Sequence, residues 1–442
     1  MKFPQYKGTV DRGDAWIGQH PSHWTVERAH FRLTSKRRSV SPAEMAGRQV
    51  IHYSIPNVQQ HGAGILEEGD DIDSAKTQLF SPTLLVSKLN PHKTTVCLAE
   101  PSSDYMTVAS GEFVPIESDQ IDLTYARYLW SSSKVSDRLI ALTQSVTRSH
   151  QRVSPEDIVK LEWAWPTLPE QRNIAAFLDR ETARIDALIE KKRRLLELLE
   201  EKRLAIITQA VTKGLDPAVP MKDSGIEWLG EVPAHWTVGR VKHFARSFNG
   251  STPSKAKSEY WEEGSVPWLS SGKVNEDVIT EPSHLISPAA LQECSLRMVP
   301  RGSIVVGIVG QGRTRGLSAY LDIDTTINQN IAAVVPQEVL NGRFLHFAFQ
   351  HAYTPIRELG RGANQAALDA GLVSEIPLAV PPIEEQIEIV EQIEDGQQEL
   401  RQVANRVQEA ISVMTEYRST LITNAVTGKI DVRNLVDDEA AA

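Results

Sequence analysis

The chain repeats itself. Trp16-Ile-Gly18 and Pro21-Ser-His-Trp-Thr-Val26 recur later in the chain, at one common offset, as Trp228-Leu-Gly230 and Pro233-Ala-His-Trp-Thr-Val238. Thr208-Gln-Ala-Val-Thr212 recurs at nearly the same offset as Thr423-Asn-Ala-Val-Thr427. Two such matches indicate two tandem copies of a unit of about 210 residues, since self-similarity at a fixed period is the signature of a repeat. Each copy is predicted to be a globular part followed by a long helix.

The composition excludes several classes of protein. Hydrophobic residues make up 41% of the 442, and their runs are shorter than the ~20 residues that a membrane span needs. The N-terminus is polar and has no apolar segment of the kind found in signal peptides. Only Cys97 and Cys294 occur, which excludes a disulfide framework and a cysteine-based zinc site. We expect a soluble cytoplasmic protein.

The negative charge is concentrated near the C-terminus. The net charge is −10, and residues 381–428 hold 9 acidic residues against 3 basic ones. Such a segment is either a solvated acidic helix face or a docking face for a partner. Because the acidity is local, the overall charge does not exclude DNA binding by other parts of the chain.

Residues 1–165 and 227–380 are expected to form two mixed α/β domains. Both are rich in short apolar runs bounded by Gly, Pro, Asn and Ser, as is typical of strands. Short helices are expected near 124–130 and 344–351. The strand order cannot be predicted. The clearest strand candidates are Thr83-Leu-Leu-Val-Ser87, Ser303-Ile-Val-Val306 and Asn330-Ile-Ala-Ala-Val-Val335.

Residues 166–213 and 381–428 are predicted to form two long helices. Apolar residues recur at heptad spacing in both, with polar interruptions at Lys192, Gln397 and Arg418. An apolar seam of this length needs a partner helix. Either two chains form an intermolecular coiled coil, or the two helices of one chain pair antiparallel, which we favour. Residues 214–226 then form a linker and 429–442 a tail.

Catalytic and metal-binding motifs are not found in the sequence. It has no Walker A pattern, no Gly-x-Ser-x-Gly elbow, no His-Glu-x-x-His and no Asn-Pro-Pro-Tyr-like tetrapeptide. The glycines from Gly307 to Gly312 resemble a phosphate loop, but we interpret them as a tight turn between strands, because the helix and acidic residue of a dinucleotide site are missing. His346 and His351 are interpreted as half-exposed helix residues. We therefore predict no catalytic residue and no metal ligand.

Polar loops in both copies have the residue types that read DNA bases. Arg makes paired hydrogen bonds to guanine, and Asn or Gln to adenine. Ordinary solvated turns have similar residues, but recurrence of the loops at matching places in both copies favours a function. The DNA-binding candidates of the first copy are Lys36, Arg37, Arg38, Asn57, Gln59, Lys88, Asn90, Lys93, Arg148, Ser149, Gln151 and Arg152. Those of the second copy are Thr252, Ser254, Lys255, Lys257, Tyr260, Ser270, Ser271, Lys273, Gln311, Arg313, Arg315, Asn328, Gln329, Arg361, Asn364 and Gln365.

The order of several motifs resembles the specificity subunit of type I restriction–modification enzymes, over essentially the whole chain. The second globular part has the Gly-x-Thr-Pro pattern of that family, whereas the first has Thr34-Ser-Lys-Arg-Arg38 in the equivalent place, as expected if the two halves read different sequences. The motifs are Leu168-Pro-Glu-Gln-Arg172, Ile207-Thr-Gln-Ala-Val-Thr-Lys-Gly214, Ser224-Gly-Ile-Glu-Trp-Leu-Gly-Glu-Val-Pro-Ala-His-Trp236 and Gly250-Ser-Thr-Pro-Ser-Lys255 with Tyr260-Trp261.

The resemblance implies a fold, a function and partners. Residues 1–165 and 227–380 would be target recognition domains, and the helices 166–213 and 381–428 would be conserved spacers paired as an antiparallel coiled coil. Each domain would read one half of a bipartite, asymmetric target in double-stranded DNA. The family implies two methyltransferase subunits, which bring S-adenosylmethionine, and can add two restriction subunits with ATP and Mg. The chain itself would hold no cofactor and would not contact a membrane.

Two other functions stay open from the residues alone. The chain could be a coiled-coil scaffold whose globular domains bind protein without reading DNA. It could also be a self-sufficient methyltransferase, but the cofactor motif that this requires is not found.

Overall fold

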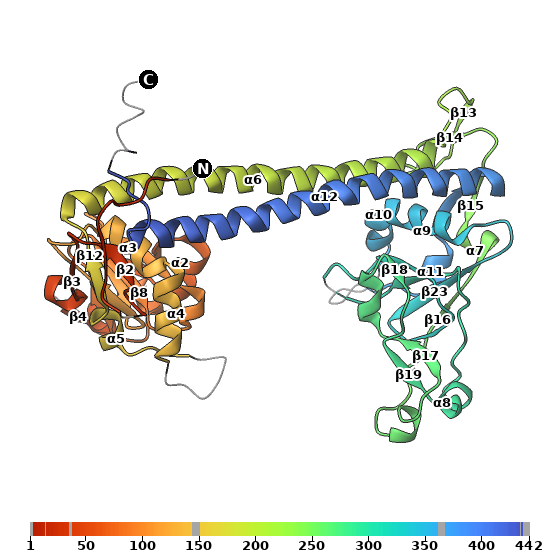
Figure 1. Cartoon of the computed structure of the whole chain (residues 1–442). Coiled ribbons are helices and arrows are strands. Elements are labelled where there is room, and N and C mark those ends of the chain that lie inside the picture. The colour runs from red at the N-terminus through yellow and green to blue at the C-terminus, as the bar shows by residue number, and fades with distance from the viewer. Residues whose placement is uncertain are drawn as a thin grey trace. The chain divides into compact units, whose positions relative to one another are not determined.

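The computed structural model describes residues 3–13, 15–34, 38–143, 151–310, 312–360, 367–433 and 435. The chain divides into two compact units, and each unit combines one globular domain with half of each long helix (Figure 1). The first unit is Met1–Lys192 with Gln408–Ala442, and the second is Arg193–Val407. The two units do not follow the boundaries predicted for the recognition domains, spacers and linker, because each unit includes parts of both long helices. Those boundaries stay a prediction.

The first domain is a mixed α/β structure. A five-stranded sheet has the order β4-β7-β10-β5-β6, in which only β10 and β5 are parallel, and an antiparallel three-stranded sheet has the order β11-β8-β9. Strand β12 pairs with β3, and β1 with β2. The strands are β1 Thr9–Asp11, β2 Gln19–Pro21, β3 Thr25–Arg28, β4 Arg38–Val40, β5 Gln49–Tyr53, β6 Ile65–Glu68, β7 Lys76–Gln78, β8 Thr83–Ser87, β9 Val96–Ala99, β10 Met106–Ser110, β11 Phe113–Ile116 and β12 Glu162–Trp165. The helices are α1 Pro42–Met45, α2 Ile55–His61, α3 Leu123–Ser131, α4 Ser133–Ala141 and α5 Pro155–Val159.

The second domain has the same types of sheet. The five-stranded sheet has the order β16-β23-β20-β21-β18, the three-stranded sheet β19-β17-β22, and β15 pairs with β24 as β13 does with β14. The strands are β13 Met221–Asp223, β14 Glu231–Pro233, β15 Thr237–Arg240, β16 Ala245–Asn249, β17 Val266–Leu269, β18 Val278–Ile279, β19 His284–Ile286, β20 Ile304–Gly307, β21 Ser318–Leu321, β22 Thr326–Ile327, β23 Ile331–Pro336 and β24 Pro377–Val380. The helices are α7 Val241–Phe244, α8 Pro288–Glu293, α9 Gly342–His351, α10 Tyr353–Glu358 and α11 Ala370–Ser374.

The two long helices are α6, Leu168–Lys213, and α12, Ile383–Val426. In the second unit a Cβ on Gly396 would lie 3.7 Å from Ile206, and one on Gly214 would lie 3.2 Å from Glu385. Residue numbers in α12 therefore decrease along the contact as those in α6 increase, so the two helices are antiparallel. In the first unit Arg418 of α12 forms an ion pair with Asp186 of α6. The predicted antiparallel pairing within one chain is confirmed in each unit.

The core of the second domain continues into its halves of the long helices. Trp236 and Phe344 pack in one cluster with Ile207 of α6 and with Ile389 and Ile393 of α12. Figure 1 shows α9 and α10 next to α12, whereas the antiparallel pair of β17 and β19 lies at the opposite end of the domain. The helix halves thus anchor this side of the domain.

The fold class predicted from the sequence is confirmed. The expected strands correspond to β8, β20 and β23, and the expected short helices to α3 and α9. One detail is wrong. His346 is fully buried rather than half-exposed, because α9 packs between the sheet and the long helices and surrounds the residue with core side chains.

Candidate nucleic-acid interface

A loop follows an equivalent buried strand in each domain. In the first domain β8 leads into a loop whose Lys88 carbonyl accepts the backbone N–H of Val153 at 2.9 Å. In the second domain β20 leads into a loop whose Ile308 carbonyl accepts the backbone N–H of Leu368, also at 2.9 Å. Val153 and Leu368 are separated by the same offset as the repeated ends of the two long helices. One group of candidate residues in each copy is thus presented by equivalent loops.

In the first domain this arrangement brings five candidates together: Lys88, Asn90, Lys93, Gln151 and Arg152. The backbone N–H of Asn90 donates to the Gln151 carbonyl at 2.8 Å, and the Gln151 N–H donates to Asn90 Oδ1 at 3.3 Å. Asn90 has φ 48°, a left-handed conformation that Asn tolerates. Lys93 is exposed, while Arg152 forms an ion pair with Glu112 at 2.6 Å. DNA contact by this group stays a prediction.

Three other candidates of the first domain have partners within the protein. Asn57 donates from its side-chain amide to the His52 carbonyl at 3.0 Å and to Glu67 at 2.7 Å. Gln59 donates to Thr95 at 3.0 Å. Arg38 lies at the start of β4 and donates to Glu44 at 3.1 Å. Asn57 in particular has an ordinary structural role, since both contacts tie α2 to β5 and β6.

In the second domain the Thr252 and Asn328–Gln329 segments meet. The Thr252 hydroxyl donates to the side-chain oxygen of Gln329, and Ser251 N–H donates to the Ile327 carbonyl at 2.9 Å. Gly250 permits this close approach, because a Cβ there would lie 2.0 Å from the Ile327 carbonyl oxygen. Asn328 is buried, whereas Gln329 is exposed. Gly250 of the Gly-x-Thr-Pro motif thus lets Thr252 contact Gln329.

A cleft of about 810 Å³ lies beside this meeting point. The indole N–H of Trp268 donates to the Ser251 carbonyl at 3.1 Å, and that of Trp261 donates to the Ser254 carbonyl at 3.2 Å. Among the residues that line the cleft are two candidates, Lys255 and Ser270, together with both tryptophans and the exposed His284. No sequence pattern pointed to His284, which belongs to no motif and reaches the cleft only through the pairing of β19 with β17.

Lys257, Tyr260 and Lys273 form contacts inside the domain. Lys257 donates to the Tyr260 hydroxyl at 2.8 Å, a hydrogen bond that raises the pKa of Lys257, and the buried Tyr260 donates to Glu293. Lys273 forms an ion pair with Glu276 at 2.8 Å. Ser271 begins the 3-10 turn Ser271–Asn275 next to this pair.

Arg313 and Arg315 lie in the turn that joins β20 to β21. The turn is closed where Gly316 N–H donates to the Gly307 carbonyl at 2.8 Å and Gly307 N–H donates to the Leu317 carbonyl at 2.9 Å. Arg313 is exposed and Arg315 half-buried. As interpreted, these glycines join two strands, but the connection covers residues 308–317 and is longer than the tight turn that was expected. Eight further candidates lie outside the described residues: Lys36, Arg37, Arg148, Ser149, Gln311, Arg361, Asn364 and Gln365.

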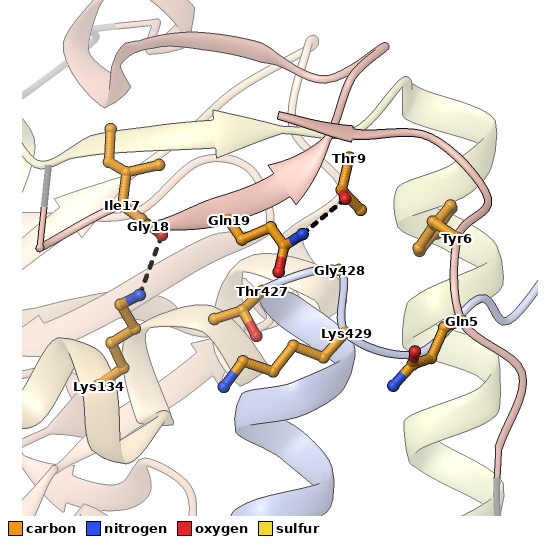
Figure 2. A pocket seen from close by; sticks show the side chains of 10 residues that line it. All are labelled: Gln5, Tyr6, Thr9, Ile17, Gly18, Gln19, Lys134, Thr427, Gly428 and Lys429. Atoms are coloured by element: carbon orange, nitrogen blue, oxygen red, sulfur yellow. Dashed lines mark hydrogen bonds between the residues drawn. The ribbon is translucent and has the colours of Figure 1, made fainter. Parts of the chain in front are cut away.

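A separate pocket of about 470 Å³ lies in the first unit, where α12 ends (Figure 2). Lys134 donates to the Ile17 carbonyl at 3.1 Å and Gln19 donates to Thr9 at 2.7 Å, while Lys429 extends from the end of α12. Cations near the C-terminal end of a helix are favoured by its dipole, which accounts for Lys429, while Lys134 is held by the Ile17 carbonyl and by the rings of Trp16 and Trp163.

Within the described ranges, the structure contains no cluster of His, Cys, Asp and Glu that could hold a metal ion. None of the helices in those ranges is long and apolar enough to span a membrane.

Comparison with known proteins gives matches in sequence and in fold. Residues 233–409 match the family model for the type I restriction modification DNA specificity domain. The EcoR124I/EcoR124II specificity subunit of Escherichia coli is 28% identical over 181 residues, 40% of this chain and 42% of the relative. The MjaIX specificity subunit of Methanocaldococcus jannaschii is 26% identical over 169 residues, and the alignment spans 38% of its length. The chain thus spans less than half the length of these two relatives.

Other similarities extend over nearly the whole chain. The putative MjaX specificity subunit of Methanocaldococcus jannaschii is 22% identical over 433 residues, 94% of this chain and 96% of the relative. A chain from a structure of complex assembly and conformational transition in a type I R-M system has a TM-score of 0.74 at 16% identity and covers 93% of this chain and 99% of its own. The HsdS subunit from Thermoanaerobacter tengcongensis has a TM-score of 0.52 at 16% identity, over 93% and 98%. These structures show that the fold is shared.

Proposed function

Because the chain belongs to the specificity subunits of type I restriction–modification systems, we propose that it selects the DNA target of such a system by reading a bipartite, asymmetric sequence. One observation carries this proposal: the equivalent loops after β8 and β20 present polar and cationic side chains, Lys88, Asn90 and Lys93 on the first domain and Arg313 and Arg315 on the second. These side chains suit hydrogen bonds to base edges in the major groove. Two domains with equivalent but differently composed loops suit a target with two different halves.

The chain is proposed to act as a non-catalytic scaffold in the cytoplasm. Its partners would be double-stranded DNA and two methyltransferase subunits, with S-adenosylmethionine bound by the methyltransferases. Two restriction subunits, which would bring ATP and Mg, can complete the assembly. Residues 1–165 and 227–380 would be the recognition domains, and 166–213 and 381–428 the spacers between them.

The alternative, a scaffold that binds only protein, makes a different prediction in a binding experiment. The purified chain, mixed with duplexes of random sequence, should bind with an affinity that falls steeply as salt rises, because each neutralised phosphate releases counterions. A protein-only scaffold would show no such binding. The experiment separates the two functions without knowledge of the target.

Mapping methylation tests the complete proposal. The chain is co-expressed with its methyltransferase subunit in a host without type I systems, and methylated adenines are mapped across the genome. We expect methylation confined to one bipartite sequence, and none when the chain is omitted. Methylation that does not depend on the chain, or that follows no bipartite sequence, would contradict the proposal.

A further inference from the structure

Helix α10 binds the backbone of the turn that carries Arg313 and Arg315. The Tyr353 hydroxyl donates to the Arg313 carbonyl at 2.8 Å. Nη1 of Arg357 donates to the Gly312 carbonyl at 2.8 Å and to the Arg315 carbonyl at 3.0 Å. Three carbonyls of one turn are therefore held by two side chains of a single helix.

The two side chains are themselves fixed against each other and against the turn. Nη1 of Arg357 also donates to the Tyr353 hydroxyl at 3.0 Å, and its guanidinium lies 5.4 Å from the centre of the Tyr353 ring. Gly316, with φ +85°, allows the arginine stem to pass, since a Cβ there would lie 2.9 Å from Arg357 Cγ. Both side chains are half-buried. Their donors point to backbone oxygens of the turn, while Arg313 itself stays exposed.

Helix α4 makes the corresponding contact in the first domain. The Ser136 hydroxyl donates to the Pro91 carbonyl at 2.9 Å, and the Thr94 hydroxyl donates to Ser136 Oγ at 3.2 Å. Pro91 and Thr94 belong to the loop after β8, which carries Asn90 and Lys93. Ser136 is buried at the N-terminal end of α4. In each copy a short helix therefore holds the backbone of the loop that follows the central strand.

We infer that α4 and α10 are braces that set the position of the DNA-reading loops, and that Ser136, Tyr353 and Arg357 are positioning residues for base specificity. The inference rests on the proposed function and adds residues that do not themselves contact DNA. Base readout by Arg depends on two hydrogen bonds of fixed geometry, so a small shift of the turn weakens discrimination between bases. Contacts with phosphates depend mainly on charge and are affected much less.

The test uses a variant that releases the turn without changing the charge. Tyr353→Phe removes one donor and keeps the ring, and Arg357→Lys keeps the charge but is one atom shorter than the arginine, whose terminal Nη1 makes both carbonyl contacts. The matched control is Arg301→Lys. Arg301 precedes β20 and forms an exposed ion pair with Asp322, so the control makes the same exchange away from the turn. Each chain is assembled with its methyltransferase subunits, and methylation is scored on a plasmid library that varies both half-sites.

For the double variant we expect discrimination against single-base changes in one half-site to fall about tenfold, the size of one base contact. The other half-site should stay as selective as in the unchanged complex, and the salt dependence of binding to random duplex should not change. Ser136→Ala should relax the other half-site instead. Arg301→Lys should leave both unchanged.

Three results would overturn the inference. In the first, the double variant discriminates like the unchanged complex at every position. In the second, both half-sites relax equally, which indicates general loosening of the protein. In the third, the unchanged complex methylates no bipartite site, and then the proposed function fails as well. Should the double variant not fold, Tyr353→Phe alone decides between the first two results, because it removes a single oxygen atom.

Discussion

The side-chain oxygen of Gln386 accepts the backbone N–H of Asn341 at 2.7 Å and thereby joins the start of α12 to the start of α9. The first unit has the same bond, in which Gln171 accepts the backbone N–H of Asp122 at 2.9 Å, just before α3. Both glutamines are fully buried and donate to the carbonyl five residues before them, at 2.8 and 3.0 Å. This buried glutamine of each repeat therefore connects a long helix to its domain.

Replacing Gln386 by Met should destabilise the second unit. The substitution leaves the Asn341 N–H and the buried carbonyl of Pro381 without their glutamine partner, and it also removes the bond to the carbonyl of the exposed Val339. An unsatisfied buried polar group costs about 1–3 kcal/mol. We therefore expect the free energy of unfolding to fall by at least that amount in urea denaturation. Gln392→Met, at an exposed position of the same helix, is the control; an equal loss in both variants would contradict the assignment.

The stability of the second unit should fall in mild acid because of His346. Its Nε2 lies 3.0 Å from Asp277 Oδ1 and its Nδ1 3.0 Å from Ser318 Oγ. Burial lowers the pKa of His346 below its usual 6.5, so the folded histidine stays neutral where the unfolded one is protonated. The unfolded state then binds more protons, and stability decreases as the pH falls below 6.5, by up to about 1.4 kcal/mol per pH unit.

The carboxyl of Asp277 does not contribute to this loss of stability in mild acid. Burial raises the pKa of its carboxyl, but hydrogen bonds from His346 and Gln350 outweigh burial and hold the pKa below 3.8, so its contribution is lost only in stronger acid. Unfolding between pH 7 and 5.5 should therefore show a smaller pH dependence in His346→Gln than in the unchanged chain. The exposed His61→Gln is the control. An identical pH dependence in all three chains would refute the role of His346.

The ion pair between Asp186 and Arg418 should contribute little to stability. Arg418 Nε and Nη2 donate to the two oxygens of Asp186 at 2.8 and 3.1 Å, but both side chains are at least one-third exposed. Pairs of this kind contribute about 0.2–1 kcal/mol. We expect a double-mutant cycle with Asp186→Ala and Arg418→Ala to give a coupling in this range at low salt and less in about 0.5 M salt, roughly three times the physiological ionic strength. A coupling that salt does not reduce would be inconsistent with a solvent-screened pair.

Patterns local in sequence predicted most of the fold. The heptads located α6 and α12, and the apolar run Thr83–Ser87 coincides with β8, because both depend on neighbouring residues alone. The parallel pairing of β10 with β5 could not be predicted, since it joins segments that lie far apart in the sequence. The burial of His346 was missed for a similar reason, as it depends on α12 covering α9.

The candidate site was predicted less completely. Asn57 was predicted to contact DNA because of its residue type. Its side-chain amide instead donates to Glu67, and no spacing in the sequence indicates this partner. Ser136, Tyr353 and Arg357 were not predicted at all. These side chains bind backbone carbonyls. Because every residue has a carbonyl, the sequence does not indicate which residue would be the partner.

Among the described candidates, Arg313 and Lys273 should behave differently when each is replaced by Ala. The Arg313 side chain is exposed on the turn after β20, whereas the Lys273 ammonium group already pairs with Glu276. Loss of a paired Arg contact to guanine costs about 1–3 kcal/mol and relaxes one position of the target. For Arg313→Ala we therefore expect methylation to extend to sequences that differ at one base of one half-site. For Lys273→Ala the methylated sequence should not change, and binding should weaken uniformly at most. If Lys273→Ala relaxed a position and Arg313→Ala did not, the bases would be read from the 3-10 turn Ser271–Asn275 and not from the turn after β20.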